Sequence, residues 1–323
     1  GGIPHDFSAS FRLGPEKGLF VIEGDEYDSA FLEKTPKFLR YCPSSAVLTS
    51  CEHDHADIYP TKDKYMDAFE KFIARIPADG VLVAYAGSGE VRELAAGAAC
   101  TVRYYALEGD DTAHAPVHWR ASVGTVRRGM QEFDLRRDER ALGRFASPLA
   151  GEHNVRNAVA AMALAADAAL APPAALGTSL MRFRCVRRRL ELVADAGGVH
   201  VYDDFAHHPT AVAETLRAVR TRVQSGRVIA VFEPRSATAG RRVHADVYPA
   251  AFAHADHAVL APVGRPEISP DERLDVAAVA REVCTRGGSA VALPTPEAIV
   301  EHVREFSRPG DAVVVMSNGP FGG

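Results

Sequence analysis

The sequence VHVYDDFAHHP at residues 199–209 predicts a strand followed closely by a helix, and it decides the fold class. Its apolar, β-branched start is typical of a strand, and proline is favoured at the first position of a helix. Strands and helices continue to alternate after it as far as residue 316. This alternation predicts a mostly parallel sheet covered by helices, so we expect an α/β protein.

The same pattern sets out the rest of the chain. In the second half we expect strands at 190–193, 199–202, 228–232, 257–260, 290–292 and 312–316, with helices at 210–223, 246–253, 274–286 and 296–306. In the first half we expect strands at 19–22, 46–49, 81–85 and 101–105, hairpins between 113 and 145, and helices at 63–76, 152–169 and from 172. Five arginines crowd residues 182–189, between the halves. We therefore expect two doubly wound, mostly parallel-sheet domains, at 1–183 and 184–323.

Composition narrows the class of protein. The chain has 323 residues with 47% hydrophobic and 24% charged side chains, enough for about two domains. Its net charge of −5 gives no basic surface for nucleic acid or an anionic membrane. We find no apolar stretch of bilayer length and no signal-peptide pattern, and the five cysteines are scattered, as reduced thiols would be. We expect a cytoplasmic protein without nucleic-acid or membrane partners.

Two acidic segments follow predicted strands. EGDEYD at residues 23–28 comes after the apolar run 19–22, and EHDHAD at residues 52–57 comes after the run 46–49. Open parallel sheets place their chemistry at the carboxyl ends of strands, so the two segments can hold a divalent cation against a phosphate. Glu23 supplies the oxygen ligand that Mg²⁺ prefers. The alternative for an isolated segment of this kind is a solvated acidic turn.

The second acidic segment also leaves two other metal sites open. Cys51, His53 and His55 fall on one face of an extended segment, which makes a zinc site an alternative. HDHAD also approaches the HxHxDH pattern of metallo-β-lactamase-like hydrolases. Ile58 stands where that pattern needs its third histidine, so the hydrolase interpretation is disfavoured.

Further motifs predict binding of a nucleotide and of a carboxylate. Asn154 and Asn157 lie three residues apart in a predicted helix, where their amides can recognise an adenine edge or merely cap the helix. The helix beginning at Pro209, with histidines before it, predicts an anion site, although a capped helix with surface histidines is an equal alternative. Arg235 ends a strand in EPRS, where its guanidinium can grip a carboxylate.

Taken in order, these pieces resemble the Mur ligase family over nearly the whole chain. They are EGDEYD, DHAD, GEHNVRNAVAA, RRRLEL, YDDFAHHPT, EPRS and SNGPFGG. The resemblance implies an N-terminal UDP-sugar domain, a central ATPase domain and a Rossmann-like C-terminal domain. No GxxxxGK[ST] phosphate loop occurs in the chain. We therefore expect residues 1–183 to be an N-terminally truncated central domain, and residues 184–323 a C-terminally truncated ligase domain. Ser50 and Pro320 depart from the family pattern, which has Asn and Gly there.

The resemblance also implies an activity, namely ATP- and Mg²⁺-dependent amide formation through an acyl phosphate. EPRS and SNGPFGG favour the member that joins the murein tripeptide L-Ala-γ-D-Glu-meso-diaminopimelate to UDP-N-acetylmuramate in peptidoglycan recycling. The alternatives are a UDP-N-acetylmuramate:L-alanine ligase and, from another class, a non-catalytic nucleotide-binding module. We expect a monomer, and we expect the isolated fragment to be inactive.

By the same resemblance each site residue receives a role. The metal site would be formed by Glu23 and His55, with Lys71 as a modified lysine that assists the metal. Three residues would hold the adenine side, namely His153, Asn154 and Asn157. Three would reach ribose and phosphates from the other domain, namely Arg189, Asp204 and His207. The peptide carboxylates would be bound by Arg235 and Ser236, with Asn318 nearby. Domain closure about residues 182–189 would assemble the site.

Overall fold

The computed structural model describes residues 2–7, 9–16, 18–30, 33–223 and 225–321. Gly322 and Gly323, the last residues of the SNGPFGG motif, lie outside the described residues. Apart from the first two residues, the chain divides into two compact units. The first holds residues 3–54 and 58–185, and the second holds residues 55–57 and 186 onwards. The division after Cys185 falls within the arginine-rich segment.

The first unit is built on a six-stranded sheet with the order β3-β4-β5-β6-β7-β8. Its strands are β3 (Ser45–Leu48), β4 (Val81–Tyr85), β5 (Thr101–Leu107), β6 (Val117–Arg127), β7 (Met130–Arg137) and β8 (Arg140–Ser147). The pairs from β3 to β6 are parallel, and β6, β7 and β8 form an antiparallel meander. The hairpins expected between residues 113 and 145 are therefore confirmed.

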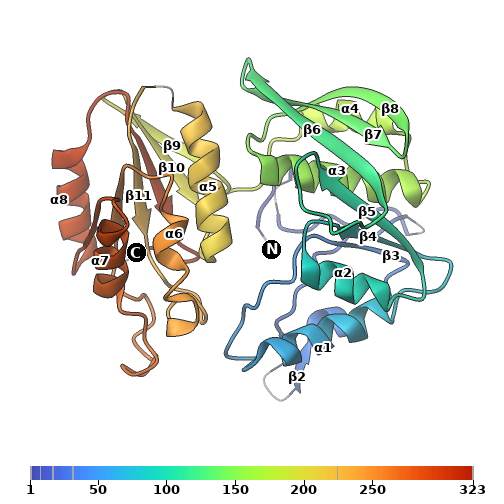
Figure 1. The fold of residues 1–323 in the computed structure, drawn as a ribbon, viewed down its shortest axis with the longest axis horizontal. Helices are drawn as coiled ribbons and strands as arrows, with labels where there is room; N and C mark the ends of the chain where they lie inside the picture. Colours follow the sequence, from blue (N-terminus) through green and yellow to red (C-terminus); the bar gives the residue numbers. More distant parts are fainter. Residues whose placement is uncertain (1, 8, 17, 31–32, 224, 322–323) are drawn as a thin grey trace. The chain divides into compact units, whose positions relative to one another are not determined.

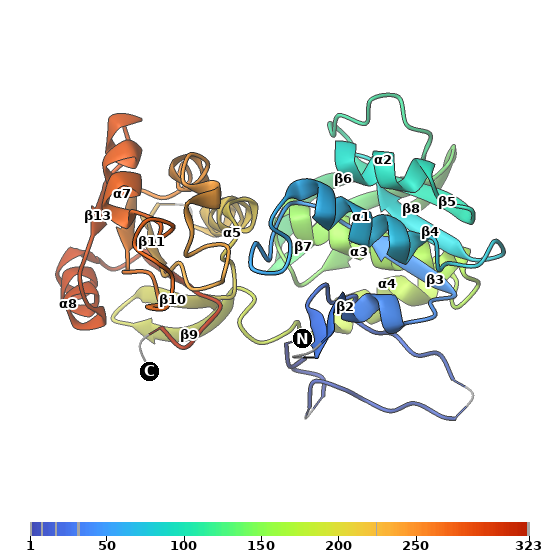
Figure 2. The same cartoon turned by 90° about the horizontal axis from the view of Figure 1, so that it is seen from below.

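Helices cover both faces of this sheet (Figures 1 and 2). The short 3₁₀ helix η1 (Lys37–Arg40), α1 (Lys62–Ile73) and α2 (Gly89–Ala96) share one apolar core with it. On the opposite face, α3 (Glu152–Asp167) and α4 (Pro173–Arg182) pack around the fully buried Trp119. Thr61 and Ser88 cap α1 and α2 by accepting backbone N–H groups. Apolar side chains thus project from both faces of the sheet and pack against helices, as a doubly wound fold requires.

The strand expected at residues 19–22 is wrong. Leu19, Phe20, Val21 and Ile22 have no strand pairing and are 47% to 89% exposed. A strand needs a ladder of hydrogen bonds, and β3 pairs only with β4 among the described residues. The regular structure nearby is instead a small antiparallel pair, β1 (Asp28–Ala30) with β2 (Glu33–Pro36). Glu23 therefore lies on an extended, exposed segment and not at a strand end.

The second unit carries the other sheet, with the order β13-β12-β11-β14-β10-β9. Its elements are β9 (Glu191–Ala196), β10 (Val199–Asp204), α5 (Pro209–Arg222), β11 (Val228–Phe232), η2 (Arg242–His244), α6 (Tyr248–Ala251), β12 (His257–Leu260), α7 (Val276–Thr285), β13 (Ala290–Ala292), α8 (Pro296–Phe306) and β14 (Ala312–Met316). Only β9 pairs antiparallel. Both sheets are thus mixed and mostly parallel with helices, which confirms the expected fold class.

The position of β14 creates a switch in strand order within this sheet. The chain leaves β10 through α5 and enters β11, and β14 returns later to lie between these two strands (Figure 1). Helices α5, α6 and α7 pack on one face and α8 packs on the other. Met316 is in register with both Asp204 and Phe232, so the three strands end at one level. Ligands of open α/β sheets bind at such a switch in strand order.

Within the described ranges, none of the helices is long and apolar enough to cross a bilayer.

Candidate functional site

The carboxyl edge of β10, β11 and β14 gathers the motifs of the second unit. Backbone hydrogen bonds tie the loops together just beyond the strands: the Glu233 N–H donates to the Met316 carbonyl at 3.0 Å, and the Ser317 N–H donates to the Asp204 carbonyl at 3.2 Å. YDDFAHHP, EPRS and SNGP, which are far apart in the sequence, therefore meet at one edge. Loops that follow parallel strands ending at one level come together in this way.

Asp204 lies inside this edge and holds it together. The side chain is buried, and its carboxylate accepts the N–H groups of Leu190 at 2.7 Å and Ala206 at 2.8 Å. The Thr215 hydroxyl donates to it at 3.3 Å. Burial raises the pKa of Asp204 above its usual range, and these hydrogen bonds oppose that rise. The carboxylate oxygens are thus already used inside the protein, so the structure gives Asp204 a structural role; its contact with a nucleotide stays a prediction.

His207 and the beginning of α5 lie where the sequence predicts an anion site, and this role stays a prediction. The His207 ring donates through its Nδ1–H to the Phe205 carbonyl at 3.0 Å. The Tyr248 hydroxyl fixes the His207 carbonyl at 2.7 Å. Helix α5 begins at Pro209, and no side chain of the described residues caps it. Its first N–H groups and its partly positive end can therefore meet a phosphate.

Arg189 lies beside the same loop. Its guanidinium carbon is 5.8 Å from the centre of the Phe205 ring, within the range of a cation–π contact. The contact orients a cation near His207, which suits the predicted role of Arg189 toward phosphates. That role stays a prediction.

Arg235 and Asn318 carry the polar groups of the edge that remain available. The Arg235 side chain is 34% exposed, and one of its N–H groups donates to Glu233 at 3.3 Å. The Asn318 side-chain oxygen is buried and lacks a hydrogen-bond partner within the described part of the chain. A buried acceptor without a donor is rare in folded proteins. Both side chains therefore offer groups that a ligand can satisfy.

Ser236 differs from these two residues. It is buried, and its hydroxyl accepts the Ala239 N–H at 2.9 Å, which closes the turn after β11. The hydroxyl can still donate its own hydrogen. The structure shows Ser236 as a turn-forming residue, and its contact with a peptide carboxylate stays a prediction.

Arg188 is a residue of this edge to which the sequence assigns no role of its own. Its guanidinium donates to Asp203 at 2.9 Å and to the carbonyls of Ser317 at 2.6 Å and Gly319 at 3.0 Å. It therefore braces the loop that carries Asn318. The cluster of five arginines at residues 182–189 is visible in the sequence. The sequence does not show which of the five contacts the loop after β14.

The predicted adenine-side residues lie at the beginning of α3 in the first unit. Gly151 precedes the helix with φ +99°, a conformation that glycine adopts without strain. The Asn154 amide donates to the Ala150 carbonyl at 2.8 Å, so its nitrogen binds the turn that precedes the helix. Asn157 is exposed, and His153 is half-buried. Asn157 is thus free in space to meet a base, whereas Asn154 has already used a donor.

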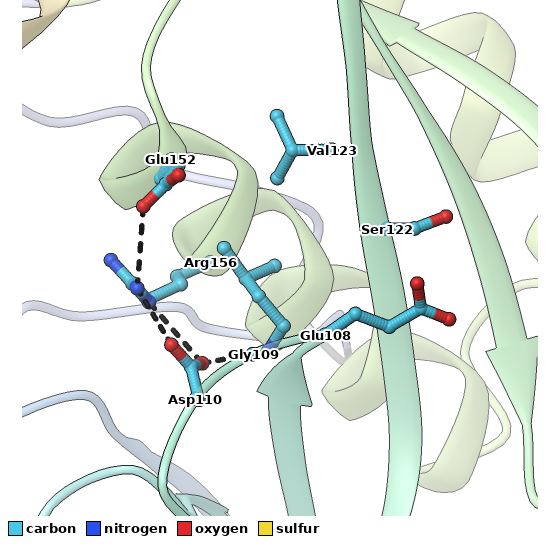
Figure 3. Close-up of a pocket in the computed structure, with 8 residues that line it drawn as sticks. Glu108, Gly109, Asp110, Ser122, Val123, Glu152 and Arg156 are labelled. Atoms are coloured by element: carbon cyan, nitrogen blue, oxygen red, sulfur yellow. Dashed lines mark hydrogen bonds and ion pairs between the residues drawn. The ribbon is translucent and has the colours of Figure 1, made fainter.

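A pocket of 440 Å³ opens beside the same helix end (Figure 3). It is lined by Leu107, Glu108, Gly109, Asp110, Ser122, Val123, Glu152 and Arg156. Arg156 donates to Asp110 at 2.7 Å and lies 3.7 Å from Glu152. Two carboxylates pair with the guanidinium of Arg156, and the carboxylate of Glu108 lines the pocket away from it (Figure 3). This acidic lining disfavours a triphosphate and favours neutral groups rich in N–H or O–H donors.

The predicted metal ligands are placed as follows. Glu23 is exposed and belongs to the first unit, whereas His55 is 9% exposed and groups with the second. His55 has φ +53°, which turns the chain and overturns the extended face expected for Cys51, His53 and His55. Such a backbone is costly for a residue with a side chain and is often found at functional sites.

No group of three or more metal-binding side chains occurs within the described residues, so these supply no zinc site. Mg²⁺ makes a smaller demand, because it takes one or two protein ligands and completes its shell with water and phosphate. The Glu23 carboxylate therefore fits Mg²⁺, whereas the His55 imidazole is a nitrogen ligand of the kind that suits other divalent metals better. Their pairing around one ion stays a prediction.

The neighbours of the predicted metal ligands have structural partners. Asp25 binds Lys37 at 3.1 Å, and Glu26 accepts the Tyr65 hydroxyl at 3.2 Å. Lys71, 60% exposed, pairs with Asp67 one helical turn earlier at 2.5 Å. This is an ordinary surface pair of α1, and the modification of Lys71 stays a prediction.

Comparison with known proteins agrees with this arrangement. Residues 12–165 match the Mur ligase middle domain, and residues 188–319 match the Mur ligase glutamate ligase domain. The UDP-N-acetylmuramate–L-alanyl-γ-D-glutamyl-meso-2,6-diaminoheptandioate ligase of Escherichia coli (strain K12) is 35% identical over 100% of this chain and 66% of its own length. The UDP-N-acetylmuramate–L-alanine ligase of Rubrobacter xylanophilus is 32% identical over 99% of this chain and 67% of its own length.

A solved structure gives the same result for the fold. The crystal structure of a murein peptide ligase from Psychrobacter arcticus 273-4 superposes with a TM-score of 0.63 at 28% identity, covering 94% of this chain and 60% of that one. The chain thus spans about two thirds of the length of the curated relatives it matches. With both halves matched in order and with strand ends that gather the expected motifs, the chain belongs to the Mur ligase family.

Proposed function

We propose that the chain acts within an ATP-dependent ligase that joins the tripeptide L-Ala-γ-D-Glu-meso-diaminopimelate to UDP-N-acetylmuramate. The observation that carries the proposal is the edge of β14, where the guanidinium of Arg235 and the unsatisfied oxygen of Asn318 lie on adjoining loops. The named activity of the Escherichia coli relative, 35% identical over the whole chain, supports the choice of substrate.

The edge has the chemistry needed for the tripeptide. The exposed part of Arg235 can donate a fork of hydrogen bonds to a carboxylate. The Asn318 oxygen can accept a hydrogen bond from an amide or ammonium group. A carboxylate cannot be its partner, because an ionised carboxylate has no hydrogen to donate. A peptide that ends in an amino acid with a free amine carries both kinds of group. Ser236 would contribute its hydroxyl hydrogen to the same carboxylate.

We assign the nucleotide to two polar helix ends. Asn157, Asn154 and His153 on α3 would meet the adenine, beside a pocket whose acidic lining suits the donors of a nucleoside. Arg189 and His207, near the uncapped beginning of α5, would meet the phosphates. The buried Asp204 would act through the loop that it ties down.

The chemistry follows from these assignments. The muramyl carboxylate would accept the γ-phosphoryl group, and the peptide amine would then displace phosphate from the acyl phosphate. Mg²⁺, held by Glu23 and His55, would supply charge neutralisation at the phosphates. The protein groups would hold amine and carboxyl carbon in line and keep water from the acyl phosphate.

Calorimetry on this chain tests the proposal. We expect the tripeptide to bind and L-alanine to compete poorly with it. The only ammonium group of L-alanine is the reacting amine, whereas the tripeptide keeps a second amine beside its terminal carboxylate for Asn318 and Arg235. Tighter binding of L-alanine than of tripeptide would favour the L-alanine ligase, the activity named for the Rubrobacter relative. We expect weak ATP–Mg²⁺ binding, because the chain has no GxxxxGK[ST] loop to cradle the phosphates. Micromolar ATP affinity without tripeptide binding would instead favour a non-catalytic nucleotide-binding module.

A further inference from the structure

The side chain of Glu233 has an unusual place at the edge of β14. Glu233 follows β11, a strand buried at every position, and its own side chain is only 8% exposed. A carboxylate in such surroundings is costly unless its oxygens are hydrogen-bonded. Nothing so far gives this residue a function.

Both oxygens of Glu233 are hydrogen-bonded, each to a different loop. The Ser317 hydroxyl donates to Oε2 at 2.5 Å, and Arg235 Nη1 donates to Oε1 at 3.3 Å. The Ser317 oxygen also accepts the Gly319 N–H at 3.0 Å. The single hydrogen of the Ser317 hydroxyl is used in its bond to Oε2. This bond fixes the orientation of the carboxylate, in which Oε1 accepts from Arg235.

Two glycines shape the space around this pair. A methyl group on Gly264 would lie 2.7 Å from Glu233 Oε1 and 3.0 Å from Arg235 Cγ. A methyl group on Gly319 would lie 2.0 Å from Arg235 Cδ. The Arg235 side chain therefore packs directly against the backbone at Gly264 and at Gly319. Arg265 also donates a hydrogen bond to the Arg235 carbonyl at 2.8 Å.

We propose that Glu233 is a positioning residue that holds the Arg235 guanidinium ready for a carboxylate of the incoming peptide. This inference rests on the proposed function. Glu233 uses one N–H of the guanidinium, and the remaining donors stay available to the ligand. A guanidinium fixed before binding loses less side-chain freedom on binding, so the peptide binds more tightly.

A binding experiment on this chain separates positioning from a merely structural role. The variants are Glu233→Gln, Ser317→Ala, Arg235→Met and the double variant of Glu233→Gln with Arg235→Met. Glu301→Gln, at an exposed position of α8, is the matched control. The probes are the tripeptide and analogues in which each carboxylate in turn is a carboxamide.

We expect Glu233→Gln to weaken tripeptide binding about tenfold, and Ser317→Ala to weaken it by a smaller factor. The loss should vanish for the one analogue that lacks the carboxylate bound by Arg235. It should also vanish in the Arg235→Met background, because Glu233 acts through that residue. The control should bind as the unaltered chain does.

Three results would overturn the inference. Unchanged binding by Glu233→Gln would show that Arg235 needs no positioning. An equal loss for every analogue, or in the Arg235→Met background, would show a structural role only. If the unaltered chain binds no tripeptide, the proposed function fails first and the inference fails with it. Thermal unfolding checks that each variant folds, and Ser317→Ala provides the same test if Glu233→Gln does not fold.

Discussion

A single methyl group at Gly319 should displace the proposed carboxylate-binding residue without changing any charge. In Gly319→Ala the added carbon would lie 2.0 Å from Arg235 Cδ and 2.2 Å from Nε, far inside the 3.5–4.0 Å of an ordinary contact. Gly319 does not have the left-handed backbone that alanine avoids. The strain therefore falls on Arg235, which is 34% exposed and can swing toward solvent.

The size of the effect follows from what Arg235 would lose. A charge-assisted hydrogen bond to the peptide contributes about 1.5–3 kcal/mol, so tripeptide binding should weaken about 10- to 150-fold. The Glu233 carboxylate would keep Ser317 as a partner but lose the guanidinium, which lowers the free energy of unfolding by about 1–3 kcal/mol. Calorimetry measures the first quantity, and urea unfolding measures the second.

Gly89→Ala is the control for this prediction. Its methyl group would meet only the flexible end of Arg92, at 3.7 Å, and should leave tripeptide binding unchanged. In an Arg235→Ala background, Gly319→Ala should cause no further loss of affinity. Gly319→Ala with the affinity of the unaltered chain would refute the assignment of Arg235 to the peptide.

Asp311→Ala should lower the free energy of unfolding in urea by about 2–4 kcal/mol, because a buried carboxylate that accepts two backbone N–H groups and a guanidinium is removed. Asp134→Ala, which breaks an exposed pair, should cost less than about 1 kcal/mol, and equal costs would contradict this difference. Burial and the neighbouring His302 lower the pKa of His257, so the folded state binds fewer protons than the unfolded state. Stability should fall as pH drops from about 6.5 through the folded-state pKa, and urea titrations of His257→Gln should show a weaker fall. Glu23→Ala should abolish ligation by the complete ligase while thermal unfolding stays the same, since the side chain is exposed; near-normal turnover at saturating Mg²⁺ would remove Glu23 from the metal site.

Much of the second unit can be predicted from sequence to the residue. β11, β12 and β14 have the expected bounds, because a strand buried on both faces is a continuous apolar run with sharp ends. Helix α8 also begins where expected, at Pro296, after Thr295 caps its first turn. These signals are local, so each element can be recognised without its neighbours.

The first unit shows where local signals fail. The run 19–22 is as apolar as a buried strand, but apolarity does not say whether an edge is available for pairing. The small β1–β2 pair was not expected, because its strands are short and carry no apolar alternation. At His55 the positive φ depends on packing that no neighbouring residue type announces.

The order of strands explains what the sequence could and could not say of the site. The sequence places YDDFAHHP, EPRS and SNGP after predicted strands, but the insertion of β14 between β10 and β11 is set by long-range packing. That insertion brings Ser317 to Glu233, a pairing across 84 positions of the chain. In the sequence Glu233 is one residue of EPRS with no role of its own, because its contact with Ser317 exists only once β14 lies beside β11.

The same packing divides the predicted site residues by what remains of their hydrogen-bonding capacity. The Asp204 oxygens accept hydrogen bonds from the backbone of the loops around them, and the Ser236 hydroxyl accepts a hydrogen bond within its own turn. Arg235 and Asn318 keep donors and an acceptor that the described residues leave for a ligand. A sequence motif cannot distinguish these two kinds of residue. The residue type is the same whether its polar group is hydrogen-bonded inside the protein or can still bind a ligand. The division follows from the strand insertion that places three loop ends at one level. Some side chains of that level hold the loops together, and Arg235 and Asn318 are the ones that we propose to bind the substrate.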